Sequence, residues 1–173
     1  MKTVLVDIER CTACKSCEIA CAVEHSVSKN LFTALFQSPL PRKRIHVEKA
    51  LTLSYPARCV HCADPVCSKA CPTGAMKRDD ATGRVLVNEQ KCIGCLMCSV
   101  VCPFGAISFD PASKVAVKCD LCASRVQQGR EPACVESCPT RALVFKEQEE
   151  AAKKKRIAAG AVIADAAGLL KSA

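Results

Sequence analysis

Short segments in which apolar and polar residues alternate recur along this chain, and each segment predicts a strand of only a few residues. The alternation over residues 3–9 predicts a first strand, and the alternation over residues 44–49 predicts another. Residues 140–145 show the same pattern near the end of the cysteine-containing region. We expect this last strand to pair with residues 3–9 and bring the two ends of that region together.

Two further segments alternate on both sides of a turn. Residues 74–78 and 84–88 flank a polar turn that ends in Gly83, and residues 106–109 and 115–117 flank a second polar turn. Each pattern predicts a β-hairpin. Both hairpins follow a Cys-Pro-x-x-Ala sequence, so a cysteine run followed by a hairpin forms an internal repeat.

Helical spacing appears in the first part of the chain. Residues 18–24 are expected to continue a cysteine run as a helical turn. Leu31, Phe32, Leu35 and Phe36 then follow at helical spacing. The favoured interpretation is an apolar stripe that packs onto the nearest domain, and the alternative is a docking patch for a larger subunit.

The last segment, residues 146–173, is dominated by Glu, Lys and Ala and contains no Pro. Its composition predicts a helix with interruptions near Gly160 and Gly168. Two interpretations stay open for this C-terminal helical tail. It is either a partly frayed terminus or a helix that docks on the body or on a partner.

Composition points to folding that depends on metal. The chain has 173 residues with 16 Cys, no Trp and only 3% aromatic residues, so an apolar core alone would be thin. No signal peptide and no apolar stretch of about 20 residues is present. We therefore expect a cytoplasmic chain without direct membrane insertion, in which cysteines bind metal rather than form disulfides.

The cysteines form four runs, and the third run reads C-x2-C-x2-C-x3-C-P. Thiolates at every third residue can wrap around one cubane iron–sulfur cluster, and the fourth cysteine then ligates another cluster. The first run has Ala22 where the others have Pro. The second and fourth runs have longer middle gaps, of four and eleven residues. The runs are Cys11, Cys14, Cys17, Cys21; Cys59, Cys62, Cys67, Cys71; Cys92, Cys95, Cys98, Cys102; and Cys119, Cys122, Cys134, Cys138.

Three kinds of cysteine chemistry compete. Disulfides give no reason for the repeated spacing, and structural zinc prefers pairs of C-x2-C and leaves the Cys-Pro ends unexplained. Iron–sulfur clusters explain the triplets and the remote fourth ligand together. Sixteen ligands then correspond to four [4Fe-4S] clusters. A zinc-stabilised adaptor without redox activity is the remote alternative.

The positive charge of the chain fits this cofactor. The formal net charge is +8. An oxidised cubane with four thiolates carries about −2, so four clusters contribute about −8 and offset it. The basic side chains are therefore interpreted as compensation for buried anionic clusters. No basic stripe interleaved with aromatic residues is present, which argues against nucleic acid as a partner.

The order of the four spacings resembles the four-cluster electron-transfer subunits of molybdopterin oxidoreductases and their relatives. The fourth run carries the most specific part of the resemblance, which covers residues 3–145. It implies an α+β fold of two tandem pseudo-symmetric bacterial 2[4Fe-4S] ferredoxin-like domains with a C-terminal helical tail. The implied domains are residues 1–58 with 111–145, residues 59–110, and a tail of residues 146–173.

The resemblance also implies four ligand sets, which we call quartets 1 to 4. Each joins three cysteines of one run to the last cysteine of another. Quartet 1 is Cys11, Cys14, Cys17 and Cys138; quartet 2 is Cys119, Cys122, Cys134 and Cys21; quartet 3 is Cys59, Cys62, Cys67 and Cys102; quartet 4 is Cys92, Cys95, Cys98 and Cys71.

The resemblance further implies an electron-transfer subunit that has no substrate site of its own and is not itself an enzyme. Residues 18–25 resemble the carbon monoxide dehydrogenase electron-transfer protein most closely. Carbon monoxide dehydrogenase is therefore the favoured donor, with a hydrogenase or a flavin-dependent NAD(P) oxidoreductase as acceptor. The alternative is the iron–sulfur subunit of a formate dehydrogenase, formate hydrogenlyase or hydrogenase.

Overall fold

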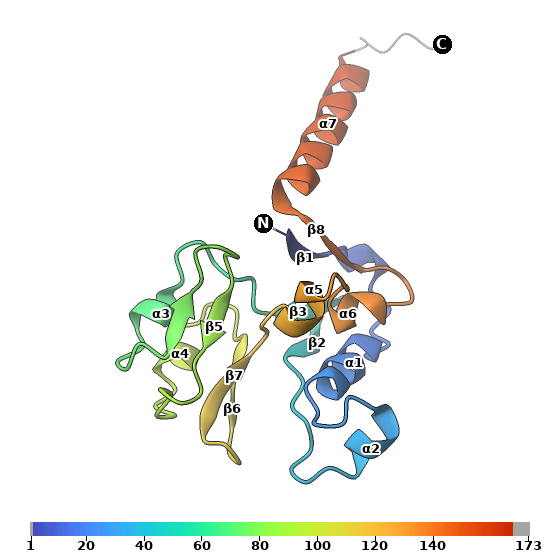
Figure 1. The fold of residues 1–173 in the computed structure, drawn as a ribbon. Coiled ribbons are helices and arrows are strands. Elements are labelled where there is room, and N and C mark those ends of the chain that lie inside the picture. The colour runs from blue at the N-terminus through green and yellow to red at the C-terminus, as the bar shows by residue number, and fades with distance from the viewer. Residues whose placement is uncertain (1, 168–173) are drawn as a thin grey trace.

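The computed structural model describes residues 2–167, and its two ends of the cysteine region lie side by side (Figure 1). Strand β1 (Lys2–Val6) pairs antiparallel with β8 (Leu143–Glu147), with Val4 opposite Phe145. This confirms the predicted pairing. The first strand is shorter than expected, because a 3-10 turn, η1 (Ile8–Arg10), takes over before Glu9.

The second strand pair contains one strand that the pattern did not predict. Strand β2 (Ile45–Ala50) pairs antiparallel with β3 (Leu53–Arg58). Pro56 lies within β3, opposite Val47. Proline cannot donate to a strand ladder and is therefore confined to edge positions, which a two-stranded ribbon provides.

Both predicted hairpins are confirmed. Strands β4 (Met76–Arg78) and β5 (Val85–Val87) pair antiparallel, and so do β6 (Ile107–Asp110) and β7 (Val115–Lys118). Gly83, with φ +68°, closes the first turn. All four strand pairs within the described residues are thus two-stranded ribbons.

Five short helices begin inside or directly after cysteine runs. They are α1 (Ser16–Glu24), α3 (Val66–Lys69), α4 (Met97–Val100), α5 (Ala123–Gln127) and α6 (Ala133–Glu136). The first of these confirms the helical continuation predicted for residues 18–24. The others have only one or two turns, which is too short to be stable without tertiary contacts.

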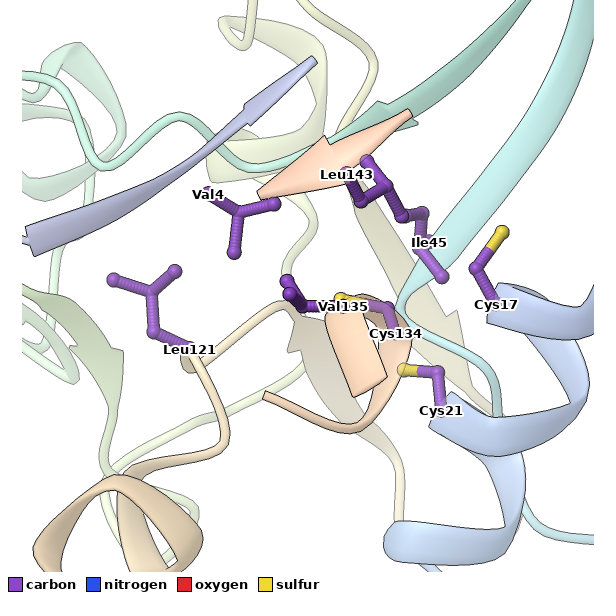
Figure 2. Close-up of a cluster of buried hydrophobic side chains, with 8 residues drawn as sticks. All are labelled: Val4, Cys17, Cys21, Ile45, Leu121, Cys134, Val135 and Leu143. Carbon is purple, nitrogen blue, oxygen red and sulfur yellow. The ribbon is translucent and has the colours of Figure 1, made fainter. Parts of the chain in front are cut away.

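Buried side chains gather in two core clusters, and cysteines take part in both. One cluster consists of Val4, Cys17, Cys21, Ile45, Leu121, Cys134, Val135 and Leu143 (Figure 2). The other consists of Cys67, Met76, Val85, Cys98, Ile107 and Ala116. The division into two ferredoxin-like domains stays a prediction, and the β6–β7 hairpin spans its boundary at residue 110.

Helix α2 (Leu31–Leu35) does not pack as the favoured interpretation required. The Asn30 side chain accepts hydrogen bonds from the N–H groups of Phe32 and Thr33 and caps the helix. Phe32 is 75% exposed and Phe36 is 88% exposed. The prediction that this stripe packs onto the nearest domain is therefore wrong, because the helix buries only Ala34.

Helix α7 (Gln148–Ala166) extends away from the rest of the molecule (Figure 1). None of its residues is buried. The predicted interruption at Gly160 is wrong, since one glycine costs only about 1 kcal/mol in a helix rich in Ala and Lys. Gly168 lies outside the described residues. Among those described, no helix combines the length and the apolar character needed to cross a bilayer.

Candidate functional site

The four cysteine runs share one backbone feature. The residue directly before the second cysteine of each run has a left-handed conformation: Ala13 (φ 57°), His61 (φ 53°), Gly94 (φ 68°) and Leu121 (φ 57°). Such a φ is uncommon for residues other than glycine. Successive right- and left-handed residues form concave turns whose N–H groups converge and favour a bound anion. The runs therefore fold as loops suited to an anionic cofactor.

The third cysteine of every run lies in a short helix and is buried. These residues are Cys17 in α1, Cys67 in α3, Cys98 in α4 and Cys134 in α6, and all are at most 8% exposed. The helix fixes the direction of this side chain, while the preceding loop places the first two cysteines of the run. The repeated sequence thus corresponds to a repeated local structure.

Three of the four implied quartets each line one small cavity. Quartet 1 lines a cavity with Pro56 and Leu143, quartet 3 lines one with Pro65 and Phe104, and quartet 4 lines one with Met76. Each cavity contains all four sulfur-bearing residues of its quartet, including the one from a remote run. The walls are otherwise mainly apolar, which excludes water from the space between the thiols.

The residues of quartet 2 lie near one another, since the thiols of Cys21 and Cys134 both interact with those of Cys119 and Cys122. Figure 2 shows Cys21 and Cys134 among the buried side chains of the first core cluster. Burial raises the pKa of Cys21 to about 12, and interaction with Cys119 and Cys122 adds to the rise. None of the sixteen cysteines forms a disulfide.

The buried thiols hold their protons tightly. Burial raises the pKa of Cys17 and of Cys122 to about 11, and it raises the pKa of Cys134 as well. The exposed Cys14 differs, since hydrogen bonds from Ser16 lower its pKa. A thiol must lose its proton to bind a metal, so metal binding here is coupled to proton release.

Backbone N–H groups point at three of the sulfur atoms. The N–H of Arg44 donates to Cys21 Sγ at 3.2 Å, that of Leu121 donates to Cys119 Sγ at 3.4 Å, and that of Ala116 donates to Cys92 Sγ at 3.5 Å. Such hydrogen bonds stabilise negative charge on sulfur and tune iron–sulfur potentials. The donor set of four thiols in a dry pocket with N–H groups nearby fits a [4Fe-4S] cluster.

Asp120 lies inside the fourth run and organises the polar groups around quartet 2. Its carboxylate accepts from the Cys122 N–H at 2.9 Å and lies 3.2 Å from His25 Nε2 and 3.1 Å from the Arg44 guanidinium. Burial by itself raises the pKa of Asp120, but the contacts with His25 and Arg44 hold it well below its usual range. Asp120 thus supplies a fixed negative charge.

Sequence reasoning missed the buried basic residues, two of which lie beside cysteine runs. Arg58 is 6% exposed and Lys118 is 3% exposed, and each directly precedes the first cysteine of a run. Arg10 and Lys91 hold the same position before the other two runs. The basic residue directly before the first cysteine of every run is the sequence signal that could have drawn attention to Arg58 and Lys118.

Comparison with known proteins agrees with the geometry. The 4Fe-4S dicluster domain family matches residues 51–148, and a 4Fe-4S binding domain family matches residues 8–24. This protein belongs to the 4Fe-4S dicluster family. This membership confirms the predicted cofactor: the chain carries four [4Fe-4S] clusters. When bound, such clusters accept and donate single electrons.

Relatives of this protein are iron–sulfur electron-transfer proteins. It is 39% identical over 150 residues to the B subunit of anaerobic dimethyl sulfoxide reductase of Haemophilus influenzae, covering 83% of this chain and 73% of that one. It is 36% identical over 177 residues to electron transport protein HydN of Escherichia coli, covering 90% and 96%. An iron-sulfur protein of Rhodospirillum rubrum is 41% identical over 147 residues, covering 78% and 76%.

These findings place this protein among iron–sulfur electron-transfer subunits. They do not support carbon monoxide dehydrogenase as the favoured partner, since none of the three names refers to it. The alternative expectation, a subunit of another oxidoreductase, agrees better with them.

Proposed function

We propose that this chain relays single electrons through four [4Fe-4S] clusters held by quartets 1 to 4. One observation carries the proposal: cysteines from different runs line common cavities in three of the four sets that the family resemblance implies. Cys138 lines the same cavity as the first run, and Cys102 lines the same cavity as the second run. Random burial of thiols gives no reason for this exchange between runs. The two ferredoxin-like domains would then correspond to quartets 1 with 2 and 3 with 4.

Exposure suggests the order of the relay. Quartets 1 and 4 each contain one exposed cysteine, Cys14 and Cys95 respectively, whereas no cysteine of quartets 2 and 3 is exposed. Quartets 1 and 2 share the first core cluster through Cys17 and Cys21. We infer that the electron path runs through quartets 1, 2, 3 and 4 in that order, with quartets 1 and 4 as its two ends.

In this relay the protein residues hold the clusters in place and shield them from water. The loops orient the thiolates, the apolar walls exclude water, and the buried charges set the local potential. In this proposal the protein has no substrate site of its own. Chemistry on a substrate belongs to a separate catalytic subunit.

The partner is proposed from the relatives. The Haemophilus influenzae relative is named as part of an anaerobic dimethyl sulfoxide reductase. We therefore favour a catalytic oxidoreductase subunit as the partner at one end of the relay. A catalytic oxidoreductase subunit thus replaces carbon monoxide dehydrogenase as the first choice of partner. A hydrogenase, a formate dehydrogenase or a flavin-dependent NAD(P) oxidoreductase also fits the role of redox partner.

The test is anaerobic isolation of the endogenous complex. We expect four irons and four sulfides for each of four clusters per chain, a broad visible absorbance that bleaches with dithionite, and a co-purifying oxidoreductase subunit identified by mass spectrometry. Zinc in place of iron, or a colourless protein, would overturn the relay. A full set of clusters with a different class of partner would correct only the partner.

A further inference from the structure

The four basic residues that precede the cysteine runs divide into two pairs. Arg10 and Lys91 precede the runs of the outer quartets 1 and 4, and both are exposed. Arg58 and Lys118 precede the runs of the inner quartets 3 and 2, and they are 6% and 3% exposed. The same sequence position therefore holds a solvated charge at each end of the proposed relay and a buried charge in its middle.

Backbone carbonyls hold the two buried cations in place. The Arg58 guanidinium donates to the carbonyl oxygen of Cys59 at 2.7 Å. Lys118 Nζ donates to the carbonyl oxygen of Cys119 at 2.9 Å and also to that of Val85. Each cation is thereby fixed beside the first cysteine of an inner quartet.

Neither cation has a carboxylate partner in the described part of the chain. Within residues 2–167, no Asp or Glu forms an ion pair with Arg58 or Lys118. Asp120 is the nearby acid, and it is already engaged by His25 and Arg44. A buried cation is strongly unfavourable unless an anion compensates it. The compensating charge must therefore come from the cysteine quartets themselves.

Lys118 lies between the two inner quartets. Its Nζ donates to the carbonyl oxygen of Cys119, a residue of quartet 2, and to that of Val85, which lines the cavity of quartet 3. Arg58 is fixed beside Cys59 of quartet 3. A positive charge held at this place acts on both inner quartets.

His61 lies with the two cations and adds a donor. It is 2% exposed, and its Nδ1 accepts from the Val85 N–H at 2.9 Å, so the proton of the neutral ring is on Nε2. This Nε2 is buried and has no hydrogen-bond partner among the described residues. An N–H group without a protein acceptor agrees with an acceptor supplied by the cofactor.

We propose that Arg58 and Lys118 form a shared counter-ion between the clusters of quartets 2 and 3 and raise the reduction potentials of both. We call this pair the cationic junction. The proposal rests on the ligand sets put forward under Proposed function. Reduction adds one electron to a cluster without a proton, and a buried positive charge nearby stabilises the more negative reduced form. The junction then makes the inner clusters easier to reduce where the relay passes between the two halves.

The experiment is a potentiometric titration of the anaerobically prepared full chain, followed by electron paramagnetic resonance. Iron is counted first in every sample. Lys118→Met is compared with Lys91→Met, a matched control in which the lysine also directly precedes a cysteine run but is exposed to solvent. Lys118→Arg keeps the charge and tests rescue. Arg58→Gln keeps a donor near Cys59 and provides the same test should Lys118→Met fail to load clusters.

We expect Lys118→Met or Arg58→Gln to lower the potentials of two of the four clusters. At the wild-type midpoint the ratio of reduced to oxidised cluster should fall about tenfold, which is about 59 mV for one electron. Lys91→Met and Lys118→Arg should leave all four potentials near wild type. Fully loaded variants with unshifted potentials, or an equal shift in Lys91→Met, would overturn the junction alone. Wild-type protein without four clusters would overturn the relay itself.

Discussion

The guanidinium of Arg125 lies 2.8 Å from the carboxylate of Glu24, although 101 residues separate them in the chain. Both side chains are nearly buried, at 8% and 9% exposure. Arg125 also pairs with Glu136 and donates to the carbonyl oxygen of Glu131 at 3.0 Å. It therefore ties helix α1 to the long loop of the fourth run, which must bring Cys134 back beside Cys122.

Replacing Arg125 by Met should destabilise this part of the molecule strongly. The substitution leaves the nearly buried Glu24 carboxylate with only the exposed Lys29 as its partner, and breaking a buried pair costs about 3–5 kcal/mol. We expect loss of visible cluster absorbance in guanidinium chloride to be at least tenfold faster than in wild type. Arg156→Met is the control, since its pair with Glu149 is exposed on both sides and contributes little. Equal rates for the two variants would contradict the role of Arg125.

The same pair predicts a dependence on pH. Burial by itself raises the pKa of Glu24, but hydrogen bonds from Arg125 and Lys29 bring it below the ordinary value of 4.5. A carboxyl with a lowered pKa contributes stability above its ordinary pKa and loses it as pH falls through the lowered value. Glu24→Gln should therefore unfold faster than wild type at pH 7, and the difference should shrink as pH drops below 4.5. A difference that stays constant with pH would rule out the charge of Glu24 as its cause.

Gly94 is predicted to tolerate no side chain. It has φ +68°, and a Cβ at this position would lie 2.6 Å from the carbonyl oxygen of Lys114 in the β6–β7 turn. Gly94→Ala should therefore lose iron from one cluster, that of quartet 4. Gly105 has φ +56° and nothing within 4 Å of a Cβ. Gly105→Ala should bear only the left-handed backbone cost of about 1–2 kcal/mol and keep all its iron. Full iron content in Gly94→Ala would contradict the steric argument.

Cys138→Ser tests the exchange of ligands between runs. We expect it to damage the cluster held by Cys11, Cys14 and Cys17, because these residues share one cavity with Cys138. Spectroscopic titration should show the change in a cluster at one end of the relay. Loss confined to the cluster of Cys119, Cys122 and Cys134, which are nearer in sequence, would contradict quartet 1.

The exposed helix α2 predicts a contrast between two apolar substitutions. Ile45 is 2% exposed in the first core cluster, so Ile45→Ala should cost about 2–5 kcal/mol. Phe36 is 88% exposed, so Phe36→Ser should change stability by no more than about 0.5 kcal/mol. Rates of cluster loss in denaturant measure both. A large effect of Phe36→Ser in the isolated protein would mean that this side chain packs in solution.

Alternation was sufficient to predict most of the strands, because each hairpin buries one face against a cysteine loop. Strand β3 was not predicted, and it contains Pro56, a residue type that is disfavoured within strands. The ribbon tolerates this proline since it has no third strand that would need its N–H. The alternation pattern therefore failed for β3, because it does not show how many strands the sheet has, and that number decides whether a proline is tolerated.

The cofactor of the candidate site was predictable because cysteine spacing is local in sequence, whereas the division of the cysteines among the clusters stays a prediction. The exposure of Phe32 and Phe36 was not predictable, since helical spacing shows that a stripe exists but not whether anything covers it. Burial of Lys118 was equally hidden. Its neighbours in sequence resemble those of Lys91, and only the folded chain places one inside and the other in water.

The left-handed residue that recurs directly before the second cysteine of each run has a consequence for protein engineering. A designer who copied one run four times would reproduce the turn and the ligands. The four clusters of such an artificial protein would have nearly equal reduction potentials, so no potential gradient would direct electrons along the relay. Differences in reduction potential between the clusters must instead come from residues outside the repeated loop, where the surroundings of the four clusters differ.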